Sequence, residues 1–409
     1  MSQHITRACF TSLVIAAVLV AVAPHAQTPT PAGGGVEFAA HTLGTELRGG
    51  YQVVVADLNR DGKPDVLALA SGIPELVWYE NPGRAAGAAA APGPQWPRHV
   101  MASGMAQMIN AAANDLDGDG IPEIALAQGF TTSPKTSTGI ISILTHGADP
   151  AAPWTIKEID RVPTAHRLRW VDADGSGKKA LVMAPLIGVD AAAPDYKSPV
   201  SIAFYRAPEF TREIVTDTFT GLIHGIEPVP WDGVRGQALL SAGFMGIYLH
   251  TFAGGKWTPG ELMKGNADPW PKSGSSDVAL GRLGAQRFIA AIEPWHGNRV
   301  AVYRQGKEGW ARQMIDDTIT DGHAIIVLDI DNDGRDEIVA GQRGGERSLI
   351  MYSASANGDA WTRRVVDQGG MAGAGCATAD LNADKRPDIV CIGTATANVK
   401  WYENLGKTR

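Results

Sequence analysis

The sequence predicts an all-β fold, a seven-bladed β-propeller of four-stranded blades. Glycine and proline are abundant, at 48 and 25 of the 409 residues, and only 19% of the residues are charged, which is typical of many short strands joined by tight turns. An acidic loop also recurs along the chain, and its first positions are Asp57, Asp115, Asp172, Pro230, Gly281, Asp329 and Asp380. These positions follow one another at intervals of 48 to 58 residues, about the length of one propeller blade.

The first repeat shows the four strands that we expect in every blade. An apolar segment at residues 53–56 enters the acidic loop, residues 65–70 leave it, and further segments follow at residues 76–80 and 96–101. The two inner segments are apolar throughout, as expected for strands that neighbouring blades cover on both faces. The outer segment carries an aromatic residue followed two positions later by arginine, and we expect the aromatic rings to fill the space between blades. This pattern returns at Phe210 and Arg212, Trp310 and Arg312, and Trp361 and Arg363.

The two ends of the repeat array indicate how the ring closes. The seventh repeat stops after its third strand, at residues 399–403, which leaves that blade one strand short. Residues 36–43 have the pattern of a strand but precede the first repeat. Pairing this N-terminal strand into the last blade would remove the two open sheet edges of a linear array. We therefore expect one propeller domain at residues 36–409.

The first 35 residues are predicted to be a targeting segment and a leader. Arg7 supplies a positive charge, and the apolar run at residues 13–23 is long enough for a secretory signal but short of a membrane span. We expect a signal peptide at residues 1–26, a flexible leader at residues 27–35 and a secreted or periplasmic protein. No later apolar stretch approaches the length of a membrane span, so no membrane span is expected.

Charge and cysteine content narrow the class of protein further. The net charge of −7 supplies no basic stripe of the kind that phosphate binding needs, which argues against nucleic acid as a partner. Cys9 would be removed with the signal peptide, which leaves Cys376 and Cys391 on neighbouring strands of one hairpin. These two could form a disulfide in an oxidising compartment or remain as buried thiols.

Three acidic loops place oxygen ligands at alternate positions, as a hard cation requires. Each has a glycine directly after the third ligand and a further acid four residues beyond that ligand. Such loops suit Ca²⁺ better than Mg²⁺, which demands stricter octahedral geometry. We predict structural Ca²⁺ there, although polar hairpin turns without an ion use the same residue types. The predicted ligands are Asp57, Asn59, Asp61 and Asp65; Asp115, Asp117, Asp119 and Glu123; and Asp329, Asp331, Asp333 and Glu337.

The repeat as a whole resembles the FG-GAP and VCBS repeats of integrin-like propellers. The resemblance is clearest from Asp115 to Glu123 (DLDGDGIPE), and it covers essentially the whole mature chain. The Asp380 loop departs from it, because Lys385 stands where the other loops have glycine. The resemblance implies the propeller fold, but the same scaffold serves adhesion, carbohydrate binding and catalysis.

A second set of residues is found by counting six positions back from each acidic loop, to the start of the innermost strand at the channel mouth. The residues at these positions are Tyr51, Ile109, His166, His224, Ser275, His323 and Ala374. His296 belongs to a turn between second and third strands, which should open on the same face, so we expect four histidines to converge there. Arg167, Arg299 and Arg343 should share this face. A cationic mouth on an acidic protein suits an anionic or oxygen-rich ligand.

Two chemistries compete for these side chains. In the first, His166, His224 and His323 bind a transition metal such as Zn²⁺ and leave one position open for water or substrate. In the second, one histidine removes a proton α to a carbonyl or carboxylate, the arginines stabilise the enolate, and Tyr51 or another histidine protonates the leaving group. Either would give β-elimination from a sugar, but a histidine bound to metal cannot also be a free base.

The motifs around the histidines resemble the propeller domain of the aldos-2-ulose dehydratases. They are HRLRW at 166–170, IHGI at 223–226, IEPWHGN at 292–298 and DGHA at 321–324. More distantly, the arrangement resembles the propeller polysaccharide lyases that cleave rhamnosyl-glucuronate linkages. The resemblance implies sugar dehydration or elimination at the channel mouth, with the matching histidines as metal ligands or acid–base groups. The dehydratases carry cupin domains after the propeller, and this chain ends after its seventh blade, so we expect the steps of those domains to be absent.

These observations together predict a secreted propeller that acts on carbohydrate by β-elimination or dehydration at the channel mouth. The cationic mouth would favour an anionic carbohydrate. The alternative is a non-catalytic propeller, stabilised by Ca²⁺, that binds glycans or other proteins. The candidate catalytic residues are Tyr51, His166, Arg167, His224, His296, Arg299, His323 and Arg343.

Overall fold

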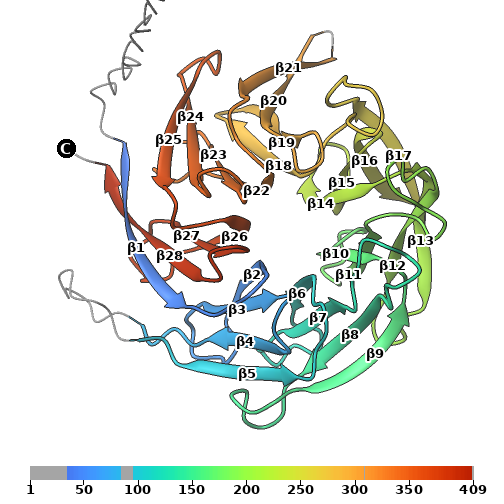
Figure 1. Cartoon of the computed structure of the whole chain (residues 1–409), viewed down its shortest axis with the longest axis vertical. Coiled ribbons are helices and arrows are strands. Elements are labelled where there is room, and N and C mark those ends of the chain that lie inside the picture. The colour runs from blue at the N-terminus through green and yellow to red at the C-terminus, as the bar shows by residue number, and fades with distance from the viewer. Residues whose placement is uncertain (1–34, 84–94, 308, 408–409) are drawn as a thin grey trace, which may run out of the picture. The chain divides into compact units, whose positions relative to one another are not determined.

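The computed structural model describes residues 35–83, 95–307 and 309–407, which form a ring of seven β-sheets around a central channel (Figure 1). Each sheet has four strands, and these described residues contain no helix, hence none that could span a bilayer. The predicted seven-bladed propeller is therefore confirmed. The predicted signal peptide and all but the last residue of the predicted leader lie outside the described residues.

Six blades each use four strands that are consecutive in the sequence and antiparallel to their neighbours. The first three blades contain β2 (Gly50–Ala56), β3 (Asp65–Ala70), β4 (Glu75–Tyr79) and β5 (Arg98–Ser103); β6 (Asn110–Asn114), β7 (Glu123–Gln128), β8 (Ile140–Thr145) and β9 (Thr155–Arg161); and β10 (Ala165–Val171), β11 (Ala180–Pro185), β12 (Pro199–Tyr205) and β13 (Arg212–Thr220). The next three contain β14 (Ile223–Pro230), β15 (Gln237–Gly243), β16 (Gly246–Ala253) and β17 (Lys256–Met263); β18 (Val278–Leu283), β19 (Gln286–Glu293), β20 (Arg299–Gly306) and β21 (Gly309–Asp316); and β22 (Gly322–Leu328), β23 (Glu337–Gln342), β24 (Leu349–Ala354) and β25 (Trp361–Asp367).

The seventh blade combines the two ends of the described chain. It contains β26 (Gly373–Ala379), β27 (Asp388–Gly393) and β28 (Val399–Lys407), and its outer strand is β1 (Val36–Gly44). β1 pairs antiparallel with β28 from Val36 opposite Lys407 to Gly44 opposite Val399. The predicted closure by an N-terminal strand is thus confirmed, and β1 covers the edge of β28 that would otherwise be open.

The apolar core lies between neighbouring blades. The second strands β3, β11, β23 and β27 are buried at every position. Leu67 and Trp78 of the first blade, for example, pack in one cluster with Ile124 and Leu144 of the second. Side chains on both faces of a sheet therefore contact another blade, which explains why the inner strands are apolar without alternation. This packing fixes the innermost strands around the channel.

A tyrosine, a carboxylate and a cation also join neighbouring blades at three places. In each set the tyrosine hydroxyl and the cation donate to the same carboxylate, which belongs to the preceding blade. The sets are Tyr205, Asp160 and Arg212; Tyr352, Asp316 and Arg363; and Tyr402, Asp367 and Lys400. The aromatic members of the outer-strand pattern pack across blades as expected, since the ring of Trp361 lies 5.5 Å from that of Phe288 and the ring of Trp310 lies 6.2 Å from that of Trp231.

The two cysteines of the last blade form a disulfide. Cys376 on β26 lies directly opposite Cys391 on β27, and their sulfur atoms are 2.03 Å apart. Of the two states that the sequence leaves open, the structure therefore contains the disulfide. The bridge joins the innermost strand of the seventh blade to the buried second strand, beside the channel.

The acidic turns need a left-handed residue directly after the third acidic position. Gly62, Gly120 and Gly334 have φ values of +82°, +94° and +83° there, a conformation that glycine adopts without steric penalty. Lys385 occupies the same position with φ +67°, and its N–H donates to Asp380 Oδ2 at 2.8 Å. The Asp380 turn therefore has the same geometry as the other turns, although the left-handed conformation is unfavourable for Lys385.

Lys385→Gly should raise the free energy of unfolding by about 0.5 kcal/mol. The left-handed conformation costs a side-chain-bearing residue about 1–2 kcal/mol, whereas the freedom that glycine adds to the unfolded chain costs about 0.5–1 kcal/mol. Gly334→Ala is the matched control and should lower stability by about 0.5 kcal/mol, because nothing lies within 4 Å of the added Cβ and the same two effects act with opposite sign. Urea titrations followed by tryptophan fluorescence measure both changes, and a less stable Lys385→Gly protein would contradict the argument.

Candidate functional site

Four side chains from four blades lie at equivalent positions at the start of the innermost strands. Tyr51 is the second residue of β2, His166 of β10, His224 of β14 and His323 of β22. In each strand the pairing register with the next strand shifts at this residue, as between Ala165 and Arg167. The shifted residue is a β-bulge, an extra residue that leaves the ladder and turns its side chain to a new direction.

These four side chains form a layer across the channel, which we call the histidine layer (Tyr51, His166, His224 and His323). The ring centroids of His166 and His224 are 4.9 Å apart, those of His224 and His323 5.0 Å, and those of His323 and Tyr51 5.0 Å. The three imidazoles are at most 1% exposed. Residues more than 270 positions apart in the sequence are thus in direct contact inside the ring.

His296 joins the layer from the turn between β19 and β20. Its Nε2 lies 3.3 Å from His224 Nε2, and its ring centroid lies 5.1 Å from that of His323. Its backbone has φ +48°, and the next residue, Gly297, has no room for a Cβ because the carbonyl oxygen of Glu293 would be 2.2 Å away. Such strain in a well-packed turn is typical of functional sites.

The hydrogen bonds of the layer assign the imidazole protons. His323 Nδ1 lies 2.6 Å from the carbonyl oxygen of Ala374, so this nitrogen carries the proton and Nε2 has a lone pair. The Tyr51 hydroxyl, 3.2 Å from that Nε2, can donate to it. His166 Nε2 then donates to the Tyr51 oxygen at 2.7 Å. This order leaves a lone pair on His166 Nδ1, which is buried and has no hydrogen-bond partner in the described structure.

Two of the three predicted arginines contact the histidines. Arg167 Nε donates to the backbone oxygen of His224 at 2.7 Å, and Arg343 Nη2 lies 3.0 Å from His296 Nδ1. Arg343 is held by Asp321, which accepts from it at 2.8 and 3.2 Å. Arg299 does not join them: it pairs with Asp268 at 3.2 Å, in a separate pocket.

Burial and nearby arginines keep the histidines neutral. Burial lowers the pKa of His166, His224 and His323 well below the usual range, and the charge of Arg167 or Arg343 lowers each further. Burial and Arg343 lower the pKa of His296 to about 3. Burial raises the pKa of Tyr51. At neutral pH the site therefore contains uncharged imidazoles and a protonated phenol.

Three of the histidines could hold a metal ion. The ligand nitrogens of His224, His296 and His323 lie within 4.8 Å of one another. Neutral imidazoles are the form that binds a metal. His166, which the sequence analysis placed in the metal set, is outside this group, and His296 takes its place. The ligand chemistry therefore fits a divalent transition metal with three histidine ligands.

Two side chains that orient these histidines were not predicted from the sequence. Asp321 fixes Arg343 and lies 3.6 Å from His296 Nδ1, and the Ser276 hydroxyl lies 3.2 Å from His224 Nδ1. Asp321 precedes His323 by two positions in the DGHA motif, which is a signal that could have found it. Ser276 lies one position after Ser275, the residue that aligns with the histidines of the other blades, and was therefore overlooked.

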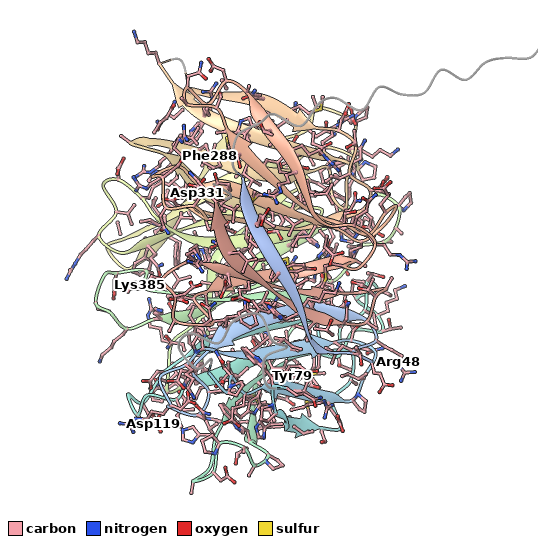
Figure 2. All side chains as sticks on the ribbon, turned by 90° about the vertical axis from the view of Figure 1, so that its left-hand side faces the viewer. Arg48, Tyr79, Asp119, Phe288, Asp331 and Lys385 are labelled. Atoms are coloured by element: carbon pink, nitrogen blue, oxygen red, sulfur yellow. A yellow bond between two sulfur atoms is a disulfide. The ribbon has the colours of Figure 1, made fainter. Side chains whose placement is uncertain are left out.

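The acidic turns lie on the opposite face of the ring. Figure 2 shows Asp119 and Lys385 at one face and Arg48, in a link between blades, at the other. The distal acid of each turn is buried and accepts the N–H of the turn's second residue: Asp65 from Leu58, Glu123 from Leu116, and Glu337 from Ile330. These carboxylates therefore shape the turns whether or not an ion is bound.

Basic side chains already contact the predicted calcium ligands. Lys63 lies 2.6 Å from Asp61, His146 lies 2.9 Å from Asp119, and Lys407 lies 2.9 Å from Asp331. Two of the turns nevertheless keep three carboxylates within 4.8 Å of one another, those of Asp115, Asp117 and Glu123 and those of Asp329, Asp331 and Asp333. Calcium at the acidic turns stays a prediction.

Comparison with known proteins gives two family matches. Residues 138–306 match the β-propeller domain of aldos-2-ulose dehydratase, and this segment contains His166, His224 and His296. Residues 57–126 and 329–391 match the FG-GAP-like repeat. Both resemblances seen in the sequence are thus confirmed.

One curated relative and one solved structure agree with these matches. The aldos-2-ulose dehydratase of Phanerodontia chrysosporium is 24% identical over 265 residues, which cover 57% of this chain and 28% of that protein. The match thus spans little more than a quarter of that relative. The solved structure of the Dos1 propeller superimposes with a TM-score of 0.51 at 9% identity, and the match covers 87% of this chain and 78% of that one. This second likeness concerns the fold alone.

The acidic turns predict that calcium stabilises the protein more as pH rises above neutrality. Burial raises the pKa of Asp65 to about 7 and that of Glu337 to about 8. The ion-free folded protein therefore binds more protons than the unfolded chain, and the stability from this effect is complete below about pH 4 and lost as pH rises through 7 to 8. Ca²⁺ binds the ionised carboxylates and should restore the stability that is lost when they deprotonate.

Thermal unfolding in EGTA should accordingly show a Tm that falls from pH 7 to pH 8.5. In this window unfolded histidine is mostly neutral, as the buried histidines are, so they contribute little. Millimolar Ca²⁺ should raise the Tm more at pH 8.5 than at pH 7, and Mg²⁺ at the same concentration should have less effect. Equal Tm values with Ca²⁺ and with EGTA at pH 8.5 would show that the turns hold no calcium.

Proposed function

We propose that this protein removes water or a glycosyl group from a sugar by β-elimination at the histidine layer, with a divalent metal as cofactor. One observation carries the proposal: ring nitrogens of three neutral imidazoles lie within 4.8 Å of one another, beside a hydrogen-bonded tyrosine and a fourth imidazole. The segment that supplies three of these histidines matches the propeller domain of a sugar dehydratase, which supports carbohydrate as the substrate class.

His224, His296 and His323 would hold the metal, which would take the His323 Nε2 lone pair in place of the Tyr51 hydroxyl and so leave the hydroxyl proton free. A divalent ion there would polarise a carbonyl oxygen of the sugar and so acidify the neighbouring C–H bond. Ser276 and Asp321 would orient two of its ligands, since they lie near Nδ1 of His224 and Nδ1 of His296. The remaining ligand, His323, is oriented by the carbonyl oxygen of Ala374.

His166 and Tyr51 would move the proton. His166 is outside the metal set, so its Nδ1 lone pair stays free to accept the proton from carbon. Its Nε2 proton then passes to the Tyr51 oxygen, 2.7 Å away, while Tyr51 gives its own proton to the departing oxygen. One C–H and one C–O bond break, one C=C bond forms, and water or an alcohol leaves with no net change in the charge of the pair.

The arginines would stabilise negative charge on the sugar. Arg343 lies against His296 at the mouth, and Arg167 lies against His224. Charge that develops on an enolate oxygen in this buried site is stabilised more strongly than it would be in water. We place the protein in a secreted or periplasmic compartment, which the N-terminal apolar run and the Cys376–Cys391 disulfide support.

The second candidate function is a calcium-stabilised, non-catalytic propeller that binds glycans or proteins. The depth of the histidines favours it, because burial that lowers an imidazole pKa also weakens the imidazole as a base. The two functions differ in what they require of the histidine layer. An enzyme needs the layer to bind metal and transfer protons, whereas a binding module needs only a surface that holds its ligand.

Metal analysis and an elimination assay on the purified protein test the enzymatic function. We expect about one divalent transition metal ion per chain, and a rise in ultraviolet absorbance from a new conjugated double bond. Suitable substrates are ketoses of the 1,5-anhydrofructose type and uronate-containing oligosaccharides. His224→Ala should lose both metal and activity, whereas His41→Gln, in the outer strand β1, should keep both. No absorbance change with any substrate, together with unchanged glycan binding by His224→Ala, would favour the binding module.

Tyr51→Phe separates proton transfer from metal binding. The substitution removes one hydroxyl, so bound metal should stay at the wild-type level while kcat falls about 10²- to 10⁴-fold, the usual contribution of a general acid. His166→Gln should behave in the same way. Full activity in Tyr51→Phe would exclude the proposed relay, and loss of metal in this variant would make Tyr51 part of the metal site.

A further inference from the structure

The central channel contains a cavity of about 470 Å³, within the usual size range of ligand pockets. Its lining extends from Tyr51 and Arg167, at the level of the histidine layer, to Arg282 and Asp336 beside the acidic turns. The imidazoles of the layer are at most 1% exposed, whereas His296 at the mouth keeps 29% of its side-chain surface. The layer therefore separates this cavity from the mouth.

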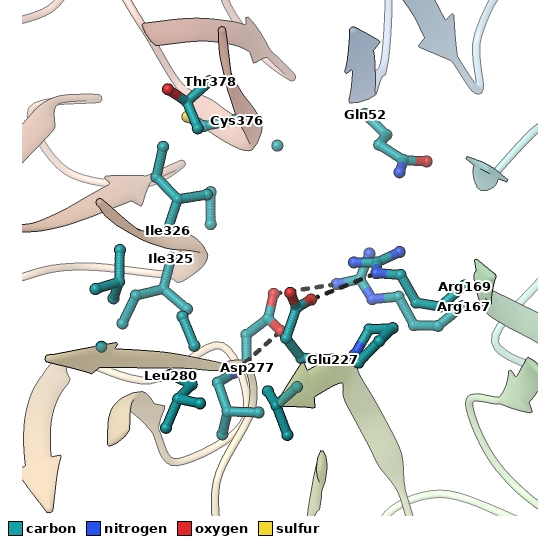
Figure 3. A pocket seen from close by; sticks show the side chains of 18 of the residues that line it. Gln52, Arg167, Arg169, Glu227, Asp277, Leu280, Ile325, Ile326, Cys376 and Thr378 are labelled. Carbon is teal, nitrogen blue, oxygen red and sulfur yellow. Dashed lines mark hydrogen bonds and ion pairs between the residues drawn. The ribbon is translucent and has the colours of Figure 1, made fainter. Parts of the chain in front are cut away.

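One side of the cavity is charged, as Figure 3 shows. Arg167 and Arg169 extend from β10 toward Asp277, next to β18, and Glu227 of β14. The shortest distances are 3.6 Å from Arg167 Nη2 to Asp277 and 3.6 Å from Arg169 Nε to Glu227. Direct charge-assisted hydrogen bonds are about 2.7–2.9 Å long, so the partners lie close without saturating one another. The two positive and two negative charges balance.

The other side of the cavity is aliphatic. Ile325 and Ile326 of β22 and Leu280 of β18 lie across the channel from the arginines (Figure 3). A ligand here would meet branched hydrocarbon on one face and paired charges on the other. That combination excludes a wholly apolar ligand, because the charged groups would lose hydrogen bonds to water.

One buried polar group in the wall has spare hydrogen-bonding capacity. Asn110 is fully buried, and its Oδ1 accepts from the N–H of Leu168 at 2.9 Å and from Arg169 at 3.3 Å. Its Nδ2 has no partner in the described structure. An unsatisfied buried donor is unusual in a native protein and calls for a partner outside the chain, such as water or a ligand. Asn110 also lines the cavity.

We propose that this cavity is a second binding site, for an uncharged polyhydroxylated molecule of the size of a monosaccharide or disaccharide. Each hydroxyl of such a ligand can accept from an arginine and donate to a carboxylate, whereas an anion would face Glu227 and Asp277 and a cation would face the two arginines. The C–H face of a sugar ring would pack on Ile325 and Ile326. The site goes beyond the proposed function, since the ligand approaches from the acidic-turn face and no bond in it needs to break.

Titration calorimetry with the full chain tests this proposal, with glucose and maltose as neutral probes and glucuronate and glucosamine as charged ones. Thr378→Trp should fill the cavity, because Thr378 lines it and is exposed there, and should weaken binding of the neutral probes about tenfold or more. Thr362→Trp is the matched control, since it places the same side chain on the exposed outer strand β25 and should leave affinity unchanged. Circular dichroism and Tm establish that each variant folds.

Glu227→Gln provides a second variant that keeps the shape of the cavity. It replaces a charged acceptor by a neutral amide and should weaken glucose binding about tenfold, the usual value of a hydrogen bond to a charged group. Unchanged affinity in both Thr378→Trp and Glu227→Gln, tighter binding of glucuronate than of glucose, or no binding of any probe would overturn the proposal.

His224→Ala distinguishes the two sites. The channel proposal requires that this variant still binds glucose, because its side chain belongs to the histidine layer and not to the cavity lining. Binding that is lost in His224→Ala but kept in Thr378→Trp would place the sugar at the mouth and contradict the channel site. Absence of elimination activity with neutral-sugar binding intact would contradict the proposed function alone.

Discussion

In five of the seven blades, the second residue of the innermost strand drops out of the ladder between the first and second strands, and in four of these blades that residue belongs to the histidine layer. Side chains of a regular strand alternate between faces, so two consecutive residues cannot both point into the channel. The bulge removes this restriction: His166 contacts Tyr51 and His224 in the layer, and the next residue, Arg167, lines the cavity below it. The layer depends on these bulges, and the bulges are held in place by blades that are packed on both faces.

Closure of the ring makes the layer possible because its members come from blades one, three, four and six. Tyr51 and His323 are 272 residues apart, and their contact exists only if the seventh blade fills the space between blades six and one. That blade is completed by β1, which pairs along its whole length with β28. An outer strand far from the channel therefore helps to set a distance of 3.2 Å at the centre of the ring.

The repeat allowed most of the fold to be predicted from sequence, since the acidic turns fix the register of every blade. Counting back from them also found the residues of the histidine layer. The same count could not reveal the bulges. A bulge changes the direction of a side chain, but no particular residue type marks its position in the sequence. The count also could not separate Arg343 from Arg299, because both were expected on the same face. Asp321 holds Arg343 against His296, whereas Asp268 holds Arg299 in another pocket. Ion pairs with loop residues depend on packing that a repeat pattern does not contain.

Electrostatics divides the channel into two chemically different parts on either side of one buried layer. At the mouth, Arg343 and Asp321 form a direct ion pair at 2.8 Å, and the partly exposed His296 stays uncharged beside them. Below the layer, Arg167 and Arg169 are each matched by a carboxylate. The imidazoles between them stay neutral because protonation would place a buried charge beside both arginine groups. The charges therefore balance on both sides of the neutral layer, but the pairs below it are more widely spaced, which suits the uncharged polyol that we propose for the cavity.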